Sequence, residues 1–351
     1  MCFISIIIPA YNVEKYIPVT IQSILNSEEV DKTDYEIIVV NDGSTDNTLQ
    51  VVKEVQKNNP DANITLLSQR NCGVSAARNY GLEKANGKFV WFVDGDDFIV
   101  SSSLKLLITV IKEYEVDVIK IGKVIRNAIE KEDLTFQTDD VANSDISQNK
   151  VTDACEMADF SLGFGHTTFI WKTSLLIDNR LRYPENIAMN EDFVFVLNSL
   201  NRASHALFNP TFQFYVVRAR ADSVSRKNKY SRTFGQYHKV QSSMLMSLVL
   251  VLKVVETIDV SNQKKLKKYN DVINQMTWFN VYYAVFSSPN MLALKYTLCE
   301  LKALGKYPIP NIDKYTAKPI IGKILNQKFS CYIFRYIWHS WLFRHIVKPY
   351  K

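Results

Sequence analysis

Asp94, Asp96 and Asp97 fall within four positions of the segment FVWFVDGDDFI, residues 89–99. The aromatic and β-branched run that precedes them is typical of a buried strand. Carboxylates this close repel each other unless a cation lies between them. Their hard oxygens favour Mg²⁺ or Mn²⁺, ions that usually share their coordination with a diphosphate. A solvated acidic turn that caps the helix expected after residue 101 is the alternative, and the segment alone leaves both open.

Asp42 follows a second apolar run in the segment VVNDGSTDNT, residues 39–48. A carboxylate at this place can accept a hydrogen bond from a ribose hydroxyl or from a base N–H. Asp-Gly pairs also form turns without any ligand. The residues themselves favour neither interpretation over the other.

Two further pairs could act on a charged substrate. Glu191 and Asp192 begin the amphipathic segment NEDFVFVLNSL, where carboxylates either react or stabilise the first turn of a helix. Arg218 and Arg220 end the apolar run FQFYVVRAR, and arginine pairs bidentately with phosphate. An exposed strand of alternating charge would contain the same arginines.

These residues need elements that bring them together, and the first 120 residues alternate strand-like and helical patterns. Apolar runs predict strands over 3–9, 35–41, 63–68, 88–94 and 116–122. Helical segments are expected over 17–26, 45–58, 75–85 and 102–114. The order βαβαβαβαβ predicts a doubly wound α/β domain, in which ligands bind beyond the carboxyl ends of the strands. PAYN (9–12), NDGSTD (41–46) and DGDD (94–97) all fall at such ends.

The remaining chain is less regular. Residues 126–150 are polar and acid-rich and predict a surface excursion. A strand is expected over 212–220, and helices near 241–258 and 268–286. The longest apolar run of the last third, Met244–Leu252, is too short to span a bilayer, so no transmembrane helix is expected.

Composition excludes several classes of protein. The chain has 351 residues, 47% of them hydrophobic, with 11 glycines and 10 prolines, which is typical of a globular protein. Its five cysteines show no CxxC spacing and predict a reducing compartment, the cytoplasm. GxGxxG does not follow the first strand and GxxxxGK[ST] is absent, which argues against dinucleotide-dependent oxidoreductases and P-loop enzymes.

The charge is uneven along the chain. Residues 226–351 carry 21 lysines and arginines against five acidic residues, a net charge of +16, which leaves −10 for residues 1–225 of a chain whose total is +6. The end of the chain combines Trp338 and Trp341 with Arg335, Arg344 and Lys348. Such a composition suits peripheral contact with an anionic membrane, and a helical bundle with a basic surface explains it nearly as well. No nucleic-acid recognition motif accompanies it.

Four segments of the chain resemble glycosyltransferase family 2, inverting enzymes with the GT-A fold. They are SIIIPAYNVEKYI, IIVVNDGSTDNT, NCGVSAARNYGLEKANGKFVWFVDGDD and NEDFVFV, in that order. The resemblance covers about residues 3–225. It implies a GT-A domain over 1–225, with a nucleotide-sugar half over 1–122 and an acceptor half over 123–225. A basic, mostly helical region over 226–351 follows.

The resemblance also implies roles for single residues. Asp192 matches the catalytic base, Asp96 the metal ligand, and Asp94 a second carboxylate beside the metal and the ribose. The implied donor-binding residues are Pro9, Ala10, Tyr11, Asn12, Glu14, Asp42, Arg78, Asp94, Gly95, Arg218 and Arg220. Glu191, His166 and Lys172 match the acceptor side.

The expected function is therefore transfer of a sugar from a nucleotide diphosphate donor, a UDP-sugar, to a saccharide acceptor on a lipid carrier, in bacterial polysaccharide synthesis. Mg²⁺ or Mn²⁺ would be the cofactor. The protein would lie in the cytoplasm, with peripheral contact at the inner face of the membrane. A nucleotide-sugar pyrophosphorylase would need a glycine-rich basic loop after the first strand, where PAYNVEKYI stands. A catalytically silent relative that acts as a scaffold subunit would have lost the carboxylates Asp94, Asp96 and Asp192, which are present.

Overall fold

The computed structural model describes residues 2–27, 29–100, 102–122, 124–127, 144–159, 165–218, 234–287 and 290–310, with 312, 323, 325–327 and 331–332 beyond them. The chain divides into two compact units. Unit 1 holds residues 1–186 and 191–220, and unit 2 holds residues 187–190 and 221–351.

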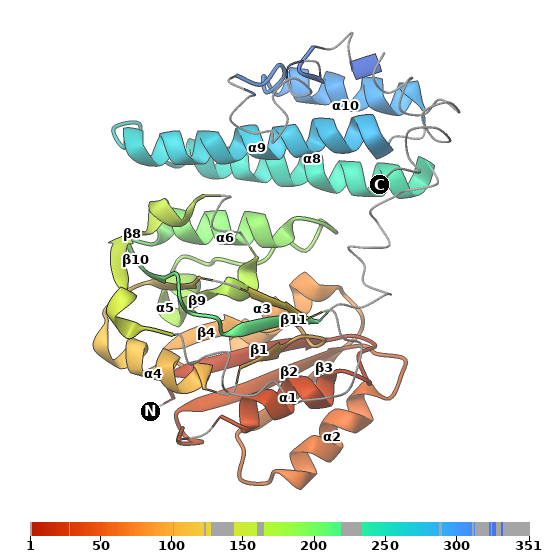
Figure 1. The fold of residues 1–351 in the computed structure, drawn as a ribbon. Coiled ribbons are helices and arrows are strands. Elements are labelled where there is room, and N and C mark those ends of the chain that lie inside the picture. Colours follow the sequence, from red (N-terminus) through yellow and green to blue (C-terminus); the bar gives the residue numbers. More distant parts are fainter. Residues whose placement is uncertain are drawn as a thin grey trace. The chain divides into compact units, whose positions relative to one another are not determined.

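Unit 1 is built on an eight-stranded, mainly parallel sheet of order β3-β2-β1-β4-β9-β6-β10-β8 (Figure 1). Its strands are β1 (Ile4–Ala10), β2 (Tyr35–Asp42), β3 (Ile64–Gln69), β4 (Phe89–Phe92), β6 (Val118–Ile121), β8 (Lys150–Asp153), β9 (Phe169–Lys172) and β10 (His205–Asn209). β9 is antiparallel to β4 and β6, and β8 is antiparallel to β10. The predicted α/β class and its parallel strands are confirmed.

Helices cover both faces of this sheet because its strands are apolar on both sides. Ile4, Ile6 and Ile8 of β1 share one buried cluster with residues of α1 (Ile17–Leu25), α2 (Thr48–Asn58) and α4 (Ser103–Glu113). Ile7 points to the other face, where α3 (Val74–Lys84) approaches so closely that a Cβ on Gly81 would lie 2.4 Å from Ile7 Cγ2. In Figure 1, α1 and α2 lie below the sheet and α6 (Glu191–Arg202) above it.

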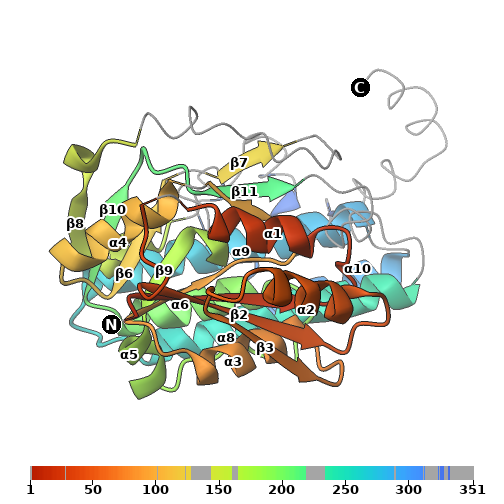
Figure 2. The same cartoon turned by 90° about the horizontal axis from the view of Figure 1, so that it is seen from below.

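A second, three-stranded sheet lies beside the end of β4. It has the order β5 (Phe98–Ile99), β11 (Tyr215–Arg218) and β7 (Val124–Asn127), and Figure 2 shows β7 and β11 side by side. β5 follows the DGDD turn directly, so β11 returns from much later in the chain to the same turn. The other elements of unit 1 are α5 (Thr173–Asp178) and the short 3₁₀ turns η2 (Ile146–Gln148), η3 (Ala154–Met157) and η5 (His166–Thr168).

Several boundaries differ from the sequence-based expectation for local reasons. The second helix begins at Thr48 rather than at residue 45, because the Asp46 carboxylate accepts hydrogen bonds from Thr48 N (3.0 Å) and Thr48 Oγ1 (2.6 Å). The strand expected over 212–220 begins at Tyr215, after the stacked rings of Phe212 and Phe214. Most of the excursion expected over 126–150 lies outside the described residues.

Unit 2 contains three long helices, α8 (Phe234–Glu256), α9 (Gln263–Ser287) and α10 (Met291–Ala303). Buried polar pairs join them, Gln241 Nε2 to Asn280 Oδ1 at 2.8 Å and Tyr237 to Thr297 at 3.0 Å between their hydroxyls. Tyr237–Glu256 of α8 is the one helical stretch in the described part of the chain that is long and apolar enough to cross a membrane, and half of its most apolar window is buried inside the protein. The tryptophan and arginine residues at the end of the chain lie outside the described residues.

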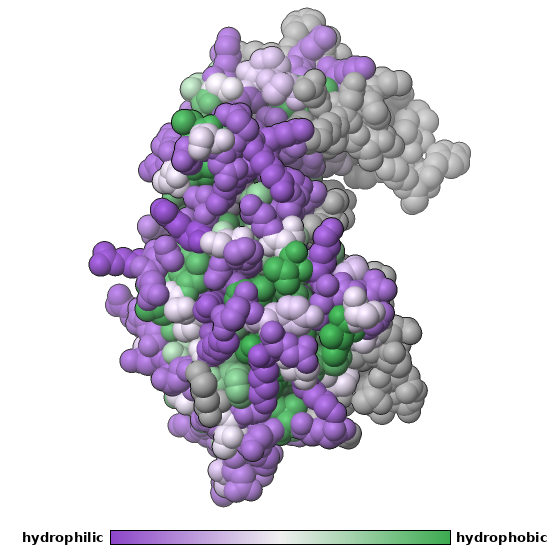
Figure 3. Space-filling model, turned by 90° about the vertical axis from the view of Figure 1, so that its left-hand side faces the viewer, coloured by the Kyte–Doolittle hydropathy of each residue, from purple (hydrophilic) through white to green (hydrophobic). Residues whose placement is uncertain are grey.

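Figure 3 shows one side of the surface, which is largely hydrophilic with apolar residues in separate small patches.

Candidate active site

Three adjacent parallel strands bring the predicted motifs to one edge of the sheet. β1 pairs with β2 on one side and with β4 on the other, so PAYN, NDGSTD and DGDD follow neighbouring strands. The loops after β1 and β2 are joined by hydrogen bonds: Asn12 Oδ1 accepts from Thr45 N at 2.8 Å, and Glu14 Oε2 accepts from Asn47 N at 2.8 Å. Asn12 has a φ of 52°, a left-handed conformation that asparagine tolerates.

The end of β1 also touches the DGDD turn. A Cβ on Gly95 would lie 2.8 Å from the carbonyl oxygen of Pro9, so the turn needs a residue without a side chain here. Ala10 is buried at the end of the strand, whereas the Tyr11 ring beyond it is 48% exposed. An exposed ring at this edge is available to a flat base.

Asp42 is buried at the end of β2 and holds the loop that leads into α3. Its oxygens accept hydrogen bonds from Gln69 Nε2 (2.7 Å), Cys72 N (2.8 Å) and Gly73 N (2.9 Å). Gly43 after it has a φ of 67° and lies against the Asn71 backbone, which excludes a side chain. The carboxylate keeps lone pairs for a further donor, but its bonds in this structure are to its own chain.

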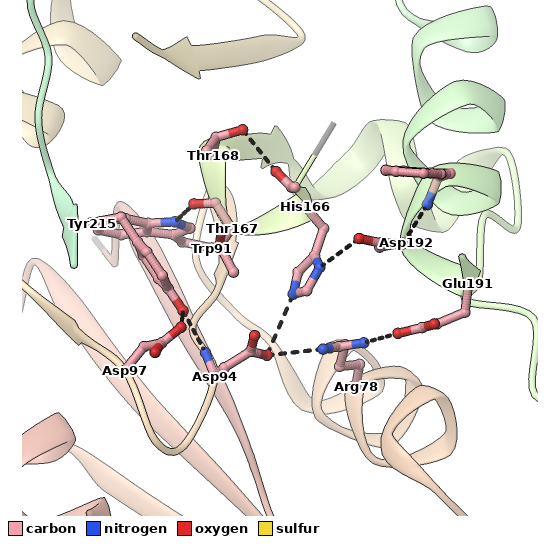
Figure 4. A network of polar contacts seen from close by, with 12 residues as sticks. Arg78, Trp91, Asp94, Asp97, His166, Thr167, Thr168, Glu191, Asp192 and Tyr215 are labelled. Atoms are coloured by element: carbon pink, nitrogen blue, oxygen red, sulfur yellow. Dashed lines mark hydrogen bonds and ion pairs between the residues drawn. The ribbon is translucent and has the colours of Figure 1, made fainter. Parts of the chain in front are cut away.

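Arg78 is the centre of a buried ionic network (Figure 4). Its guanidinium donates to Asp94 Oδ1 at 2.8 Å and to Glu191 Oε1 at 3.2 Å, and it lies 5.1 Å above the centre of the Tyr183 ring. The side chain is 4% exposed, which is tolerable for a cation only because it is paired. One residue of α3 therefore joins the end of β4 to the beginning of α6.

His166 lies on the other side of Asp94, on the turn η5. Its Nε2 is 3.5 Å from Asp94 Oδ1 and its Nδ1 is 3.9 Å from Asp192 Oδ2. Burial and Arg78 would lower the pKa of this imidazole, but Asp94 and Asp192 outweigh them and raise the pKa above its ordinary value. The structure thus brings Arg78, Asp94, His166, Glu191 and Asp192 together, although they come from four separate segments.

The DGDD turn is held from behind by β11. The Tyr215 hydroxyl donates to Asp97 Oδ2 at 2.8 Å and accepts from Asp94 N at 3.1 Å, and Arg218 N donates to Asp97 Oδ1 at 2.9 Å. Arg218 Nε donates to the Asp96 carbonyl oxygen at 3.0 Å, and its guanidinium lies between the rings of Tyr16 and Phe98. Asp97 is therefore a structural link between the turn and β11.

Burial acts on the pKa values of the partly exposed Asp94 and the buried Asp97 in the same direction, and the neighbours of each decide the outcome. Burial raises the pKa of Asp97 to about 8, and the negative charges of Asp94 and Asp96 add to the rise. Burial would also raise the pKa of Asp94, but Arg78 and His166 beside it outweigh burial and hold the pKa below its usual range. Asp94 is consequently an ionised carboxylate that two neighbours already neutralise.

The site fits a divalent cation at Asp96 better than at Asp94. Both side chains are partly exposed, but Asp94 Oδ1 already faces the cationic Arg78 at 2.8 Å and His166 at 3.5 Å. In the part of the chain that the structure describes, three or more histidine, cysteine or acidic side chains nowhere gather to hold a metal by themselves. One carboxylate suffices where substrate phosphate and water complete the shell of Mg²⁺.

Of the expected residues, Lys172 lies away from this edge of the sheet. Lys172 pairs with Phe89 at the beginning of β4, the end of the strand opposite Asp94, and its Nζ lies 3.4 Å from Glu115 at the surface. Arg220 lies outside the described residues. Tyr183 and Tyr215 contact the cluster and were not predicted, because only the fold shows that their phenol rings face it.

The edge of the sheet and the carboxylates at its strand ends define an α/β domain with the GT-A fold. Solved structures agree: Staphylococcus aureus TarS residues 1–349, crystallised in complex with UDP-GlcNAc, superposes with a TM-score of 0.69 at 23% identity over 95% of this chain and 89% of that one. A mannosyltransferase from Pyrobaculum calidifontis, in complex with GDP-Man and Mn²⁺, gives a TM-score of 0.52 at 12% identity over 96% of this chain and 88% of that one.

Sequence comparison matches part of the chain to a family. Residues 5–161, a little under half of the chain, match the family described as Glycosyl transferase family 2. The chain is 32% identical over 228 residues to poly(ribitol-phosphate) beta-N-acetylglucosaminyltransferase TarS of Staphylococcus aureus, which is 63% of this chain and 36% of that protein. It is 30% identical over 216 residues to a poly(ribitol-phosphate) beta-glucosyltransferase of Bacillus spizizenii, 61% of this chain and 32% of that protein. The chain thus spans about a third of the length of both relatives.

Proposed function

We propose that this protein is an inverting glycosyltransferase that moves one sugar from a nucleotide diphosphate donor to a saccharide acceptor in bacterial surface-polysaccharide synthesis. The observation that carries the proposal is the cluster in Figure 4, where Asp94 of the DGDD turn and Asp192 of α6 face the two nitrogens of the same His166 ring. A donor-side carboxylate and a separate carboxylate for the acceptor are what a single displacement requires.

Asp192 is the proposed base. Its Oδ1 accepts a hydrogen bond from Phe193 N at 2.9 Å, which leaves Oδ2 to take the proton of the acceptor hydroxyl as that oxygen attacks the anomeric carbon of the sugar. Glu191 is paired with Arg78 and is a positioning group in this scheme. Arg78 neutralises the carboxylates around the reaction centre so that an anionic donor can approach.

The donor end is proposed at the strand ends of β1, β2 and β4. Tyr11, Asn12 and Asp42 would receive the base and ribose, and Arg218, with Arg220 after it, the diphosphate. Asp96 is the proposed ligand of Mg²⁺ or Mn²⁺, with Asp94 behind it. A bound cation would supply positive charge to the departing nucleotide diphosphate. The Mn²⁺ in the structure of the similar mannosyltransferase supports the presence of a divalent cation.

A UDP-sugar is the donor we propose, and the UDP-GlcNAc complex of TarS supports it. The acceptor would be a polysaccharide of the teichoic acid kind or a lipid-linked saccharide, because the relatives act on poly(ribitol-phosphate). A cytoplasmic location with peripheral contact at an anionic membrane rests on the +16 charge of residues 226–351. Co-sedimentation of the full chain with anionic but not with neutral vesicles would support that contact, and equal recovery with both would contradict it.

A catalytically silent, nucleotide-sugar-binding scaffold subunit is the alternative. It requires no carboxylate at the acceptor side, whereas Asp192 is present and lies 3.9 Å from His166 in the cluster.

The test is a panel of UDP-, GDP- and dTDP-sugars, with release of nucleotide measured in Mn²⁺ and in EDTA. We expect release from at least one UDP-sugar and at least a tenfold loss in EDTA. Nucleotide-sugar binding without release from any donor, with teichoic acid or lipid-linked acceptors supplied, would favour the scaffold subunit.

A further inference from the structure

The turn that carries His166 is anchored from both sides by buried hydrogen bonds. Trp91 Nε1 donates to the Thr167 carbonyl oxygen at 2.8 Å. Lys120 Nζ donates to Thr168 Oγ1 at 2.8 Å, and this hydroxyl in turn donates to the Gly165 carbonyl oxygen at 2.7 Å. The buried Lys120 of β6 thus supports the site indirectly, because it holds the turn η5 at Thr168, two residues after His166.

The His166 ring itself is fixed by Tyr183. The two rings meet edge to face with centres 5.8 Å apart. Tyr183 stacks on Phe195 of α6 at 3.9 Å, and Asn79 of α3 holds its backbone, with Tyr183 N donating to Asn79 Oδ1 at 2.8 Å and Asn79 Nδ2 donating to Tyr183 O at 2.9 Å. The imidazole therefore has little freedom to turn away from the carboxylates.

Both ring nitrogens of His166 are buried and make no hydrogen bond to the described residues. Each nevertheless faces one carboxylate, Asp192 through Nδ1 and Asp94 through Nε2. Buried polar atoms without a partner cost free energy, so an arrangement that keeps two of them between two acceptors needs a reason. Catalytic contacts are often long in a ligand-free site and shorten in the substrate complex.

His166 Nδ1 faces Asp192 Oδ2 at 3.9 Å, and the Tyr183 phenol also interacts electrostatically with this carboxylate. Arg78 forms its ion pairs with Asp94 and Glu191. We propose that His166 is a positioning residue, which holds Asp192 Oδ2 toward the acceptor hydroxyl through Nδ1 while Nε2 ties the same ring to Asp94 beside the donor. This inference rests on the proposed function, and it assigns to His166 a task on the base rather than contact with the acceptor sugar.

Three variants of the full-length protein separate the two contacts. His166→Asn places an amide near the position of Nδ1, His166→Gln places one near Nε2, and His166→Phe places none. Release of UDP from UDP-GlcNAc gives kcat and the donor KM, and the shift of the unfolding temperature by UDP reports donor binding. His205→Gln, an exposed histidine of β10, is the matched control.

We expect His166→Phe to lower kcat by about 10- to 100-fold, the usual effect of losing a group that orients a reactive residue, with the donor KM and the UDP shift within about threefold. His166→Asn should retain a higher kcat than His166→Gln, because the Asn amide lies near Nδ1 and can keep the contact that positions Asp192. A kcat within twofold of wild type in all three variants, a parallel loss of UDP binding, or better recovery by His166→Gln would overturn the inference. If the wild type releases nucleotide from no donor, the proposed function fails instead, whatever the variants do.

Discussion

At the scale of single residues, the site is organised by charge balance. Asp94, Glu191 and Asp192 carry three carboxylates into a largely buried region, and Arg78 and His166 are the groups that face them. Removing one member of such a pair strongly destabilises the protein, because the other member is left as an unpaired buried charge. These pairs explain why the Arg78 side chain is stable although only 4% of it is exposed.

Lys120 is a buried residue whose charge can be tested by pH. Burial lowers its pKa to about 7 in the folded protein, whereas an unfolded lysine has a pKa of about 10.4. Between these pH values the unfolded chain binds more protons, so the stability of the wild type rises with pH through this window, by at most ~1.4 kcal/mol per pH unit from this group. Lys120→Met removes the titrating group.

We expect the free energy of unfolding of Lys120→Met, measured in urea, to fall progressively below that of the wild type as pH rises from 7 to 10, because only the wild type gains stability from this group. Lys57→Met, at an exposed position of α2, is the control for loss of one lysine. A difference between Lys120→Met and wild type that stays constant over this range would show that Lys120 keeps its charge in the folded protein.

At the scale of elements, β1, β2, β3, β4 and β6 were predictable because apolar runs alternate regularly with helical segments over the first 120 residues. β1, β2 and β4 are buried on both faces and appear in the sequence as continuous apolar runs. β8, β9 and β10 are about as short as β4 and β6, but they were missed because the chain that contains them shows no such regular alternation. Their hydrogen-bond partners also lie far away in the chain.

The candidate site was predictable to the same degree. The carboxylates at the strand ends follow from the fold class, whereas the pairing of Arg78 with Asp94 and Glu191 joins residues 16 and 113 positions apart and depends on tertiary packing. The sequence groups Asp97 with Asp94 and Asp96 and indicates no separate partner for it. Tyr215, its partner, comes from 118 residues later.

Helix α3 carries Arg78 and Asn79, and its distance from the sheet decides where both side chains lie. Gly81→Ala would place a Cβ 2.4 Å from Ile7 Cγ2, so the Ile7 side chain, α3 or β1 must shift. Alanine favours a helix, but we expect a net loss of about 1–3 kcal/mol in unfolding free energy, the usual cost of overpacking. We also expect weaker UDP binding, because α3 carries Arg78 and Asn79.

Urea denaturation and the UDP-induced shift in unfolding temperature measure the two effects. Gly235→Ala in α8 is the matched control, since nothing lies within 4 Å of the added Cβ. Unchanged stability and unchanged UDP binding in Gly81→Ala would mean that the contact between α3 and β1 is not a constraint on the site.

At the scale of the whole molecule, the sequence divides by charge and the structure divides by packing. The break in charge at residue 226 lies close to the point where the chain passes from unit 1 into unit 2 after residue 220. Residues 187–190, directly before Glu191, also belong to unit 2, where Ala188 N donates to Ser243 Oγ at 3.0 Å and Ser247 Oγ donates to the Met189 carbonyl oxygen at 3.0 Å. No pattern in the sequence indicates that this four-residue segment belongs with α8.

The central claim is that Asp192 is the base of a sugar transfer. The most direct measurement compares UDP release from UDP-GlcNAc, or from the best donor of the panel, by the wild type, Asp192→Asn and the surface control Asp178→Asn. The account predicts that Asp192→Asn lowers kcat by about 10²- to 10⁴-fold, the range expected for loss of a general base, while UDP binding and the folding temperature stay close to those of wild type. Turnover of Asp192→Asn within about threefold of wild type would contradict the account.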